Sequence, residues 1–120
     1  MKVKVIRANK WEHPGEFPDF EKGAAVKIAK EEDADFLGWY ACDIAGYETF
    51  VPKSFVYNGV LAREYNPTEL VQEVGDILEV REIINAWLFA KNENGVTGWI
   101  PAESVVSVDS AGADILKKEN

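Results

Sequence analysis

The chain has 120 residues, of which 47% are hydrophobic and 28% charged, and its formal net charge is -8. This composition is typical of a folded domain and excludes a disordered chain. The negative charge repels phosphate backbones and anionic lipid surfaces, so we expect neither nucleic acid nor a membrane as a partner. A single cysteine, Cys42, no signal-peptide core and no bilayer-spanning apolar run together predict a cytoplasmic protein without an internal disulfide.

The first half of the chain alternates short apolar segments with turn signals, a pattern that predicts β-strands. The segment 1–7 shows the period-two alternation of a half-buried strand, and a turn-rich excursion follows over 9–17. Further strands are predicted at 24–30, 39–42 and 49–51. The acidic run at 31–35 lacks the glycine turn and the ligand spacing of a calcium loop, so we interpret it as a solvated loop without a metal.

The two halves of the chain meet at Asn58-Gly59, which stands between Val56-Tyr57 and Val60-Leu61. Asn-Gly between β-branched and aromatic residues is the strongest short hairpin signal, because a type I′ turn requires positive φ at both positions. We therefore predict that the last strand of the first half pairs with the first strand of the second half. Such pairing would join two units rigidly or let them exchange strands.

The second half follows the same plan with shorter loops. Strands are predicted at 61–65, 77–81, 87–90 and 99–101, with turns near Gly75 and Gly95. We expect no helix before the tail at 107–120. The tail is predicted to be a mobile terminus, because its one apolar fragment is too short to hold a helix unaided.

One stretch of the sequence occurs twice, at 47–56 and at 95–105. In each copy an aromatic and a β-branched residue end a strand, a proline follows, and a valine restarts a strand four residues later. Proline cannot donate to a ladder, so each strand is expected to end at Pro52 or Pro101 and a turn to begin there. The tryptophans that precede these prolines by about a dozen residues are Trp39 and Trp87.

The repeat predicts that the chain consists of two similar units. Each copy of roughly fifty residues is near the lower limit for a stable core, so two such units are expected to pack closely and stabilise each other. We predict an all-β protein with one unit at 1–57, a second at 58–106 and the tail at 107–120.

The second unit carries a set of short motifs in a specific order: Glu69-Leu70, Gly75-Asp76, Trp87, Gly98-Trp99-Ile100-Pro101 and Val105. On these residues the segment 61–106 closely resembles the Src homology 3 family, particularly its divergent bacterial members. The first unit is a weaker match, through Phe20, Lys22, Gly23, Trp39, Pro52 and Phe55. The resemblance implies a five-stranded, partly open barrel for each unit, with a short 3₁₀ turn after each proline.

Members of this family hold polyproline II peptides in a shallow aromatic groove. By resemblance, the groove residues are Tyr65, Trp87 and Pro101 in the second unit and Trp39, Pro52 and Phe55 in the first. Arg63 and Ser104 stand where the family groove usually has tyrosines, and Arg7 and Asn9 replace the early tyrosines of the first unit. The resemblance also implies that flanking carboxylates pair with Arg or Lys of the peptide, and the candidates are Glu12, Glu16, Glu69 and Glu73.

These residues predict a non-enzymatic tandem module that binds protein or peptide segments, basic or proline-containing, without a cofactor. The sequence has no phosphate loop, nucleophile elbow or zinc spacing, and Cys42 with His13 is a thiol–imidazole pair without an orienting motif. Two alternatives stay open. The aromatic residues could be used internally, in a two-barrel scaffold or in a homodimer formed by strand exchange near Asn58-Gly59, or the chain could bind bacterial cell-wall peptide or glycan.

Overall fold

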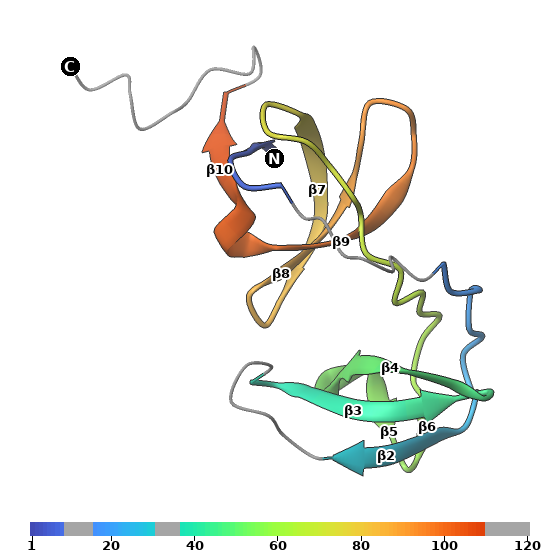
Figure 1. Cartoon of the computed structure of the whole chain (residues 1–120). Coiled ribbons are helices and arrows are strands. Elements are labelled where there is room, and N and C mark those ends of the chain that lie inside the picture. The colour runs from blue at the N-terminus through green and yellow to red at the C-terminus, as the bar shows by residue number, and fades with distance from the viewer. Residues whose placement is uncertain (9–15, 31–36, 110–120) are drawn as a thin grey trace. The chain divides into compact units, whose positions relative to one another are not determined.

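The computed structural model describes residues 1–8, 16–30 and 37–109, which form an all-β structure (Figure 1). Ten strands and two 3₁₀ turns are the regular elements of this part of the chain. Across the same residues, no helix is long and apolar enough to cross a bilayer. The prediction of an all-β fold is confirmed. The predictions for Asn9, Glu12, His13, the run 31–35 and residues 110–120 of the tail fall outside the described residues.

The chain forms two compact units. Unit 1 consists of Met1–Gly15 and Thr68–Asn120, and unit 2 consists of Glu16–Pro67. This division differs from the expected boundary between residues 57 and 58, because the first strand lies with the second half of the chain and 58–67 lie with the first half. Unit 1 is thus discontinuous in sequence, and unit 2 is inserted between its two segments.

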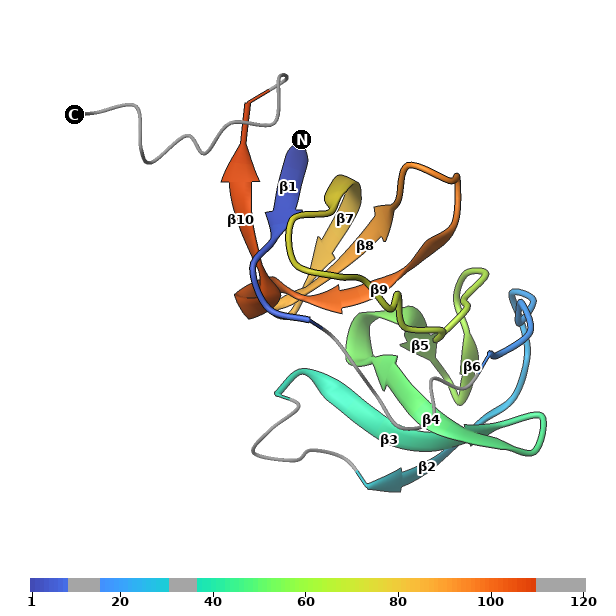
Figure 2. The ribbon, with the colours of Figure 1, turned by 45° about the horizontal axis from the view of Figure 1, so that its top comes forward.

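Unit 1 is built on a five-stranded antiparallel sheet in the order β10–β1–β7–β8–β9 (Figure 2). The strands are β1 (Lys2–Val5), β7 (Ile77–Ile84), β8 (Trp87–Lys91), β9 (Thr97–Pro101) and β10 (Val105–Val108), and the 3₁₀ turn η2 (Ala102–Ser104) precedes β10. Lys2 of β1 lies opposite both Val108 and Glu79, so β1 is an inner strand with a partner on each side. The core consists of Val3, Val5, Leu70, Leu78, Leu88, Ala90 and Ile100.

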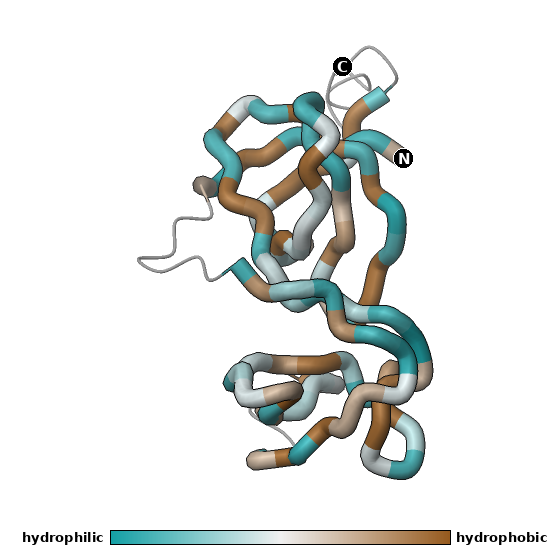
Figure 3. Tube along the Cα trace, turned by 90° about the vertical axis from the view of Figure 1, so that its right-hand side faces the viewer, coloured by the Kyte–Doolittle hydropathy of each residue, from teal (hydrophilic) through white to brown (hydrophobic). Residues whose placement is uncertain are grey.

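Alternation along β1 explains how the strand is buried. Val3 and Val5 are in the core, whereas Lys2 and Lys4 point to the other side of the sheet. Figure 3 shows the same alternation of apolar and polar residues along the chain trace. The period of two predicted a half-buried strand over 1–7, and the apolar side chains of this pattern do lie in a core.

Unit 2 contains a three-stranded sheet, β2–β3–β4, and a two-stranded hairpin, β5–β6. Its elements are β2 (Val26–Lys30), β3 (Trp39–Ile44), β4 (Tyr47–Pro52), the 3₁₀ turn η1 (Lys53–Phe55), β5 (Val56–Tyr57) and β6 (Val60–Leu61). A bridge between Ala25 and Val60 connects the hairpin to the residue before β2. The neighbours therefore run β5–β6–β2–β3–β4, which matches the order β10–β1–β7–β8–β9 of unit 1.

Both units end their last hairpin as the repeat predicted. β4 ends at Pro52 and β9 ends at Pro101, and a 3₁₀ turn follows each proline. In both units the residue after the proline donates a 2.9 Å backbone hydrogen bond to the residue before the tryptophan. These bonds run from Lys53 N–H to the Gly38 carbonyl and from Ala102 N–H to the Ala86 carbonyl.

The turns that lead into β2 and β7 also match. Gly23 N–H donates to the Leu61 carbonyl in unit 2, and Gly75 N–H donates to the Val5 carbonyl in unit 1, both at 2.8 Å. Leu61 of β6 thus occupies in unit 2 the position that Val5 of β1 occupies in unit 1. The repeat is present, but its first strands are exchanged: β1 completes unit 1 and β6 completes unit 2.

The exchange has a local cause in the turn at Asn58-Gly59. Asn58 (φ 51°) and Gly59 (φ 77°) both have positive φ, and the turn pairs Val56 with Leu61. The hairpin predicted from Asn-Gly is confirmed. A two-residue turn holds β6 beside β5, so β6 stays in unit 2, and β1 takes the equivalent place in unit 1.

Three expected elements are corrected by the observed strands. The segment 61–65 is not the first strand of the second unit, because β6 is Val60–Leu61 and pairs within unit 2. β7 continues to Ile84, three residues beyond its expected end. Ser107 and Val108 belong to β10 rather than to a tail, because β1 lies beside them.

Candidate functional site

One face of β8 and β9 carries the tryptophan and the proline that the sequence repeat singles out. Trp87 lies directly opposite Pro101, and Phe89 lies directly opposite Trp99. Because side chains alternate along a strand, Trp87 and Phe89 point away from the core, in which Leu88 lies. We call this set the aromatic face: Trp87, Phe89, Trp99 and Pro101.

One residue of the aromatic face is buried, and the other three are partly exposed. The ring centroids of Phe89 and Trp99 are 5.2 Å apart, and the rings are inclined at 51°. Trp99 is buried, whereas Trp87, Phe89 and Pro101 are half-buried. Aromatic rings held by a sheet lose little side-chain entropy on contact with a ligand. Such a face is suited to apolar contact and stacking.

Unit 2 contains the matching pair but buries it. Trp39 lies opposite Pro52, and the ring of Phe55 packs edge-on against Tyr65 with centroids 5.5 Å apart. The Tyr65 hydroxyl donates a 2.6 Å hydrogen bond to the carbonyl oxygen of Phe50. Trp39 and Tyr65 are each 5% exposed, and Pro52 and Phe55 are also buried. We call Trp39, Pro52, Phe55 and Tyr65 the buried cluster.

The structure groups the predicted groove residues differently from the sequence. A surface of Tyr65, Trp87 and Pro101 is not formed within one unit, because Tyr65 lies in unit 2 and the other two lie in unit 1. Tyr65 follows β6, and the exchange of that strand carries it to Phe55. Arg63, which stands where the family usually has a tyrosine, has its guanidinium carbon 4.3 Å from the centre of the Phe55 ring. A cation–π contact therefore occupies that position.

Two of the four acidic candidates, Glu69 and Glu73, lie in the segment before β7, whereas Glu16 is an exposed residue of unit 2. Glu69 forms a parallel bridge with Trp99, so it borders the aromatic face. Glu73 is exposed and lies in the turn into β7, where its N–H donates a 2.9 Å hydrogen bond to a carboxylate oxygen of Asp76. Of the two, Glu69 is the one that the backbone places beside a residue of the aromatic face.

Sequence reasoning missed two residues of this region. Phe89 belongs to the aromatic face, and its signal was available, because it stands two residues after Trp87 in the same strand. Glu103 is exposed in η2, two residues after Pro101. Both positions follow from residues that the repeat already marks.

The thiol of Cys42 has no features of an activated nucleophile. Its side chain is buried in β3, and burial, followed by the negative charge of Asp43, raises the pKa of the thiol to about 11. The thiol is therefore protonated at neutral pH, which fits the expectation of a structural cysteine. Among residues 1–8, 16–30 and 37–109, no group of three or more His, Cys, Asp or Glu side chains is placed to hold a metal ion.

The buried thiol predicts a loss of stability at high pH. In the unfolded chain Cys42 titrates near its ordinary pKa of 9.0, whereas in the folded chain it titrates near 11. Stability from the neutral thiol is fully present below pH 9 and is lost as the pH rises through 11, by about 2–3 kcal/mol in total. Urea unfolding at a series of pH values should show this decline in the parent, relative to Cys42→Ala. Parallel pH dependences in the two proteins would show that the thiol of the parent has the same pKa in the folded and the unfolded chain.

Comparisons of the chain with protein-family models, with curated proteins and with solved structures find no match. The case for a function therefore comes from the residues and geometry of the two units.

Proposed function

We propose that the chain is a non-enzymatic binding module for a protein or peptide segment, basic or proline-containing, and that its two units are partly open Src homology 3-like barrels. The shared strand order, the turn before β2 and β7, and the 3₁₀ turn after each proline support the second part of this proposal. The first part rests on the chemistry of one surface, the aromatic face of unit 1.

The observation that carries the binding proposal is the half-buried pair of Trp87 and Pro101 on neighbouring strands. A tryptophan beside a proline offers a flat apolar surface, on which the rings of an extended proline-containing peptide can stack. Glu103 is exposed just beyond Pro101, and the chain as a whole carries a net charge of -8. Both charges favour a segment that also carries Lys or Arg.

The buried cluster of unit 2 supports a second role, that of a scaffold. Trp39, Phe55 and Tyr65 occupy the positions of a groove but are buried, and the Tyr65 hydroxyl is used inside its own unit. These side chains act in folding, and we assign ligand contact to unit 1 alone. A homodimer through Asn58-Gly59, and binding of cell-wall peptide or glycan, stay predictions.

Replacement of Trp87 by alanine is expected to weaken peptide capture about tenfold or more, because a central aromatic residue carries a large share of binding energy. The measurement is an NMR titration of labelled protein with a pool of basic proline-rich peptides, followed through the indole signals of Trp39, Trp87 and Trp99. In the parent protein we expect shifts of the Trp87 and Trp99 indole signals and none of the Trp39 signal.

The matched control is Tyr57→Ala, which removes an aromatic side chain that is 70% exposed at the β5–β6 hairpin. This variant should bind like the parent. Indole signals that all stay unchanged, in a spectrum of a well-folded protein, would contradict the binding proposal and leave the scaffold role. Shifts of the Trp39 signal alone would show that the peptide binds to unit 2.

A further inference from the structure

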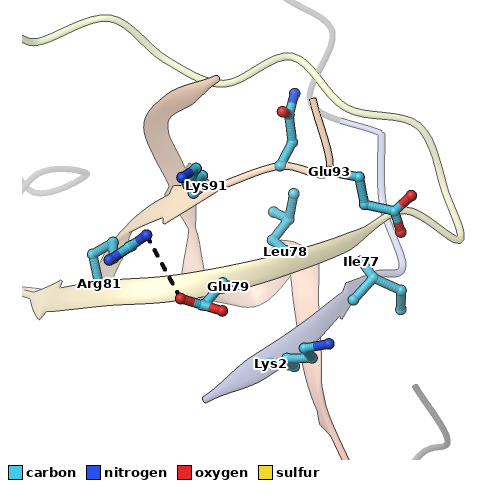
Figure 4. Close-up of a pocket in the computed structure, with 8 residues that line it drawn as sticks. Lys2, Ile77, Leu78, Glu79, Arg81, Lys91 and Glu93 are labelled. Atoms are coloured by element: carbon cyan, nitrogen blue, oxygen red, sulfur yellow. Dashed lines mark ion pairs between the residues drawn. The ribbon is translucent and has the colours of Figure 1, made fainter. Parts of the chain in front are cut away.

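A pocket of about 280 Å³ opens on unit 1 and is lined by residues other than the groove candidates (Figure 4). Its charged and polar lining comes from β1, β7, β8 and the turn after β8. These residues are Lys2, Glu79, Arg81, Lys91, Asn92 and Glu93. The volume is near the lower end of the roughly 300–1,000 Å³ typical of ligand pockets, so it fits one chemical group rather than a whole drug-sized molecule.

Strand register brings the cations of the pocket together. Glu79 lies opposite Lys2 on one side and opposite Lys91 on the other, so the three side chains form a row across β1, β7 and β8. Side chains of directly opposite residues share one face of a sheet. Figure 4 shows Lys2 and Lys91 on the strands that flank Glu79.

A β-bulge adds a third cation to this row. The register of β7 and β8 shifts between Val80 and Glu82, which leaves Arg81 as the extra residue. Bulges often re-aim a side chain at a binding site. Here the guanidinium of Arg81 reaches back to Glu79, with Nη2 3.6 Å from Oε1, as the dashed line in Figure 4 marks.

The cations of the pocket are only partly neutralised. The Arg81–Glu79 pair is long, and its side chains are 48% and 53% exposed, so it contributes little energy. Within the described ranges 1–8, 16–30 and 37–109, neither Lys2 nor Lys91 makes an ion pair. Three cations therefore face two carboxylates, Glu79 and Glu93, in a chain whose overall charge is -8.

We propose that this pocket binds an oxyanion, a carboxylate or phosphate group carried by a ligand. The guanidinium of Arg81 supplies a planar pair of donors that matches such a group, and the ammonium groups of Lys2 and Lys91 add charge from either side of β7. Glu79 is the resident competitor, because its carboxylate already lies against Arg81. This site does not depend on the aromatic face or on the proposed peptide ligand.

The test is an NMR titration of the full chain with inorganic phosphate and, separately, with succinate, at constant ionic strength set with sodium chloride. We expect saturable shifts confined to the amides of 77–81 and 91–93. Arg81→Gln and Lys91→Gln should each weaken binding about two- to fivefold, the range of an exposed charge pair. Glu79→Gln should strengthen binding, because it removes the competitor. The tighter of the two probes identifies the group.

The matched control is Lys27→Gln, which removes the same charge from an exposed residue of β2 in unit 2. It should bind both probes like the parent. Equal affinities in Arg81→Gln, Lys91→Gln and Lys27→Gln would overturn the proposal, because binding would then follow net charge alone. Weaker binding in Glu79→Gln, or an absence of shifts around the pocket with both probes, would also overturn it.

Discussion

A chain that lacks β1 is expected to lose the fold of unit 1 and to keep the fold of unit 2. β1 pairs with β10 on one side and with β7 on the other, so its removal splits the sheet of unit 1. Val3 and Val5 are almost fully buried in that core, and each contributes about 1.5–3 kcal/mol by burial. Unit 2 takes all of its strands from Glu16–Pro67, so its sheets keep every strand.

The measurement uses a chain that begins at Glu16, with the indole signals of Trp39, Trp87 and Trp99 as reporters. Trp87 and Trp99 should collapse to random-coil positions, and Trp39 should stay dispersed. If Trp39 collapses and Trp99 stays dispersed, the division at residue 57 describes the protein better than the observed units do.

A rearranged chain is expected to restore the fold of unit 1. Val108 lies directly opposite Lys2, as Tyr57 lies opposite Val60 at the ends of the turn Asn58-Gly59. Residues 68–108 joined through an Asn-Gly link to residues 2–8 should therefore fold as unit 1 alone. Failure of this chain to fold, while 16–67 folds, would show that unit 1 needs unit 2.

Replacement of Gly98 by alanine is the second change with a large expected effect. A Cβ at this position would lie 2.9 Å from the backbone nitrogen of Leu70, 3.0 Å from its Cβ and 3.1 Å from its Cα. Leu70 cannot easily withdraw, because it is buried in the core and its N–H donates a 2.8 Å hydrogen bond to the Trp99 carbonyl. We expect Gly98→Ala to lower the unfolding free energy by about 1–3 kcal/mol, the usual cost of overpacking.

Urea unfolding of unit 1, followed at Trp99, measures this cost. The control is Thr97→Ala, which changes the exposed neighbour in the same strand and should cost about 0.5 kcal/mol or less. Equal effects of the two substitutions would show that the backbone of Leu70 gives way. Gly98 matters here because the backbone of Leu70 passes close to it, as a glycine inside a strand often indicates.

The local features of the fold, including hairpins, could be predicted from sequence, but the pairing of strands far apart in the chain could not. Alternation over 1–7 and the Asn58-Gly59 turn predicted β1 and the β5–β6 hairpin, because both depend on neighbouring residues. Strand exchange at Asn58-Gly59 was one of two expected outcomes, but the place of β1 in unit 1 was not predicted, because β1 and β6 are both short strands and either could complete either unit. Alternation tells which side chains enter a core, not which core they enter.

The candidate sites divide in the same way. The resemblance implies one surface for Trp87 and Pro101, and the two residues lie opposite each other on strands that are joined by one hairpin. The move of Tyr65 to Phe55 depends on β6, and the position of Arg81 depends on a bulge, so neither could be derived from spacing. Burial of Trp39 likewise depends on tertiary packing, which the sequence of its strand does not specify.

The exchange of strands sets an order of events during synthesis. Unit 2 has all of its strands once Pro67 has been made, whereas β1, which precedes the other described strands in the chain, pairs with β10, which ends at Val108. At about 5–20 residues per second, β1 waits on the order of ten seconds for its second partner. Until then the core around Val3 and Val5 is incomplete, and any unpaired sheet edge nearby can capture the strand.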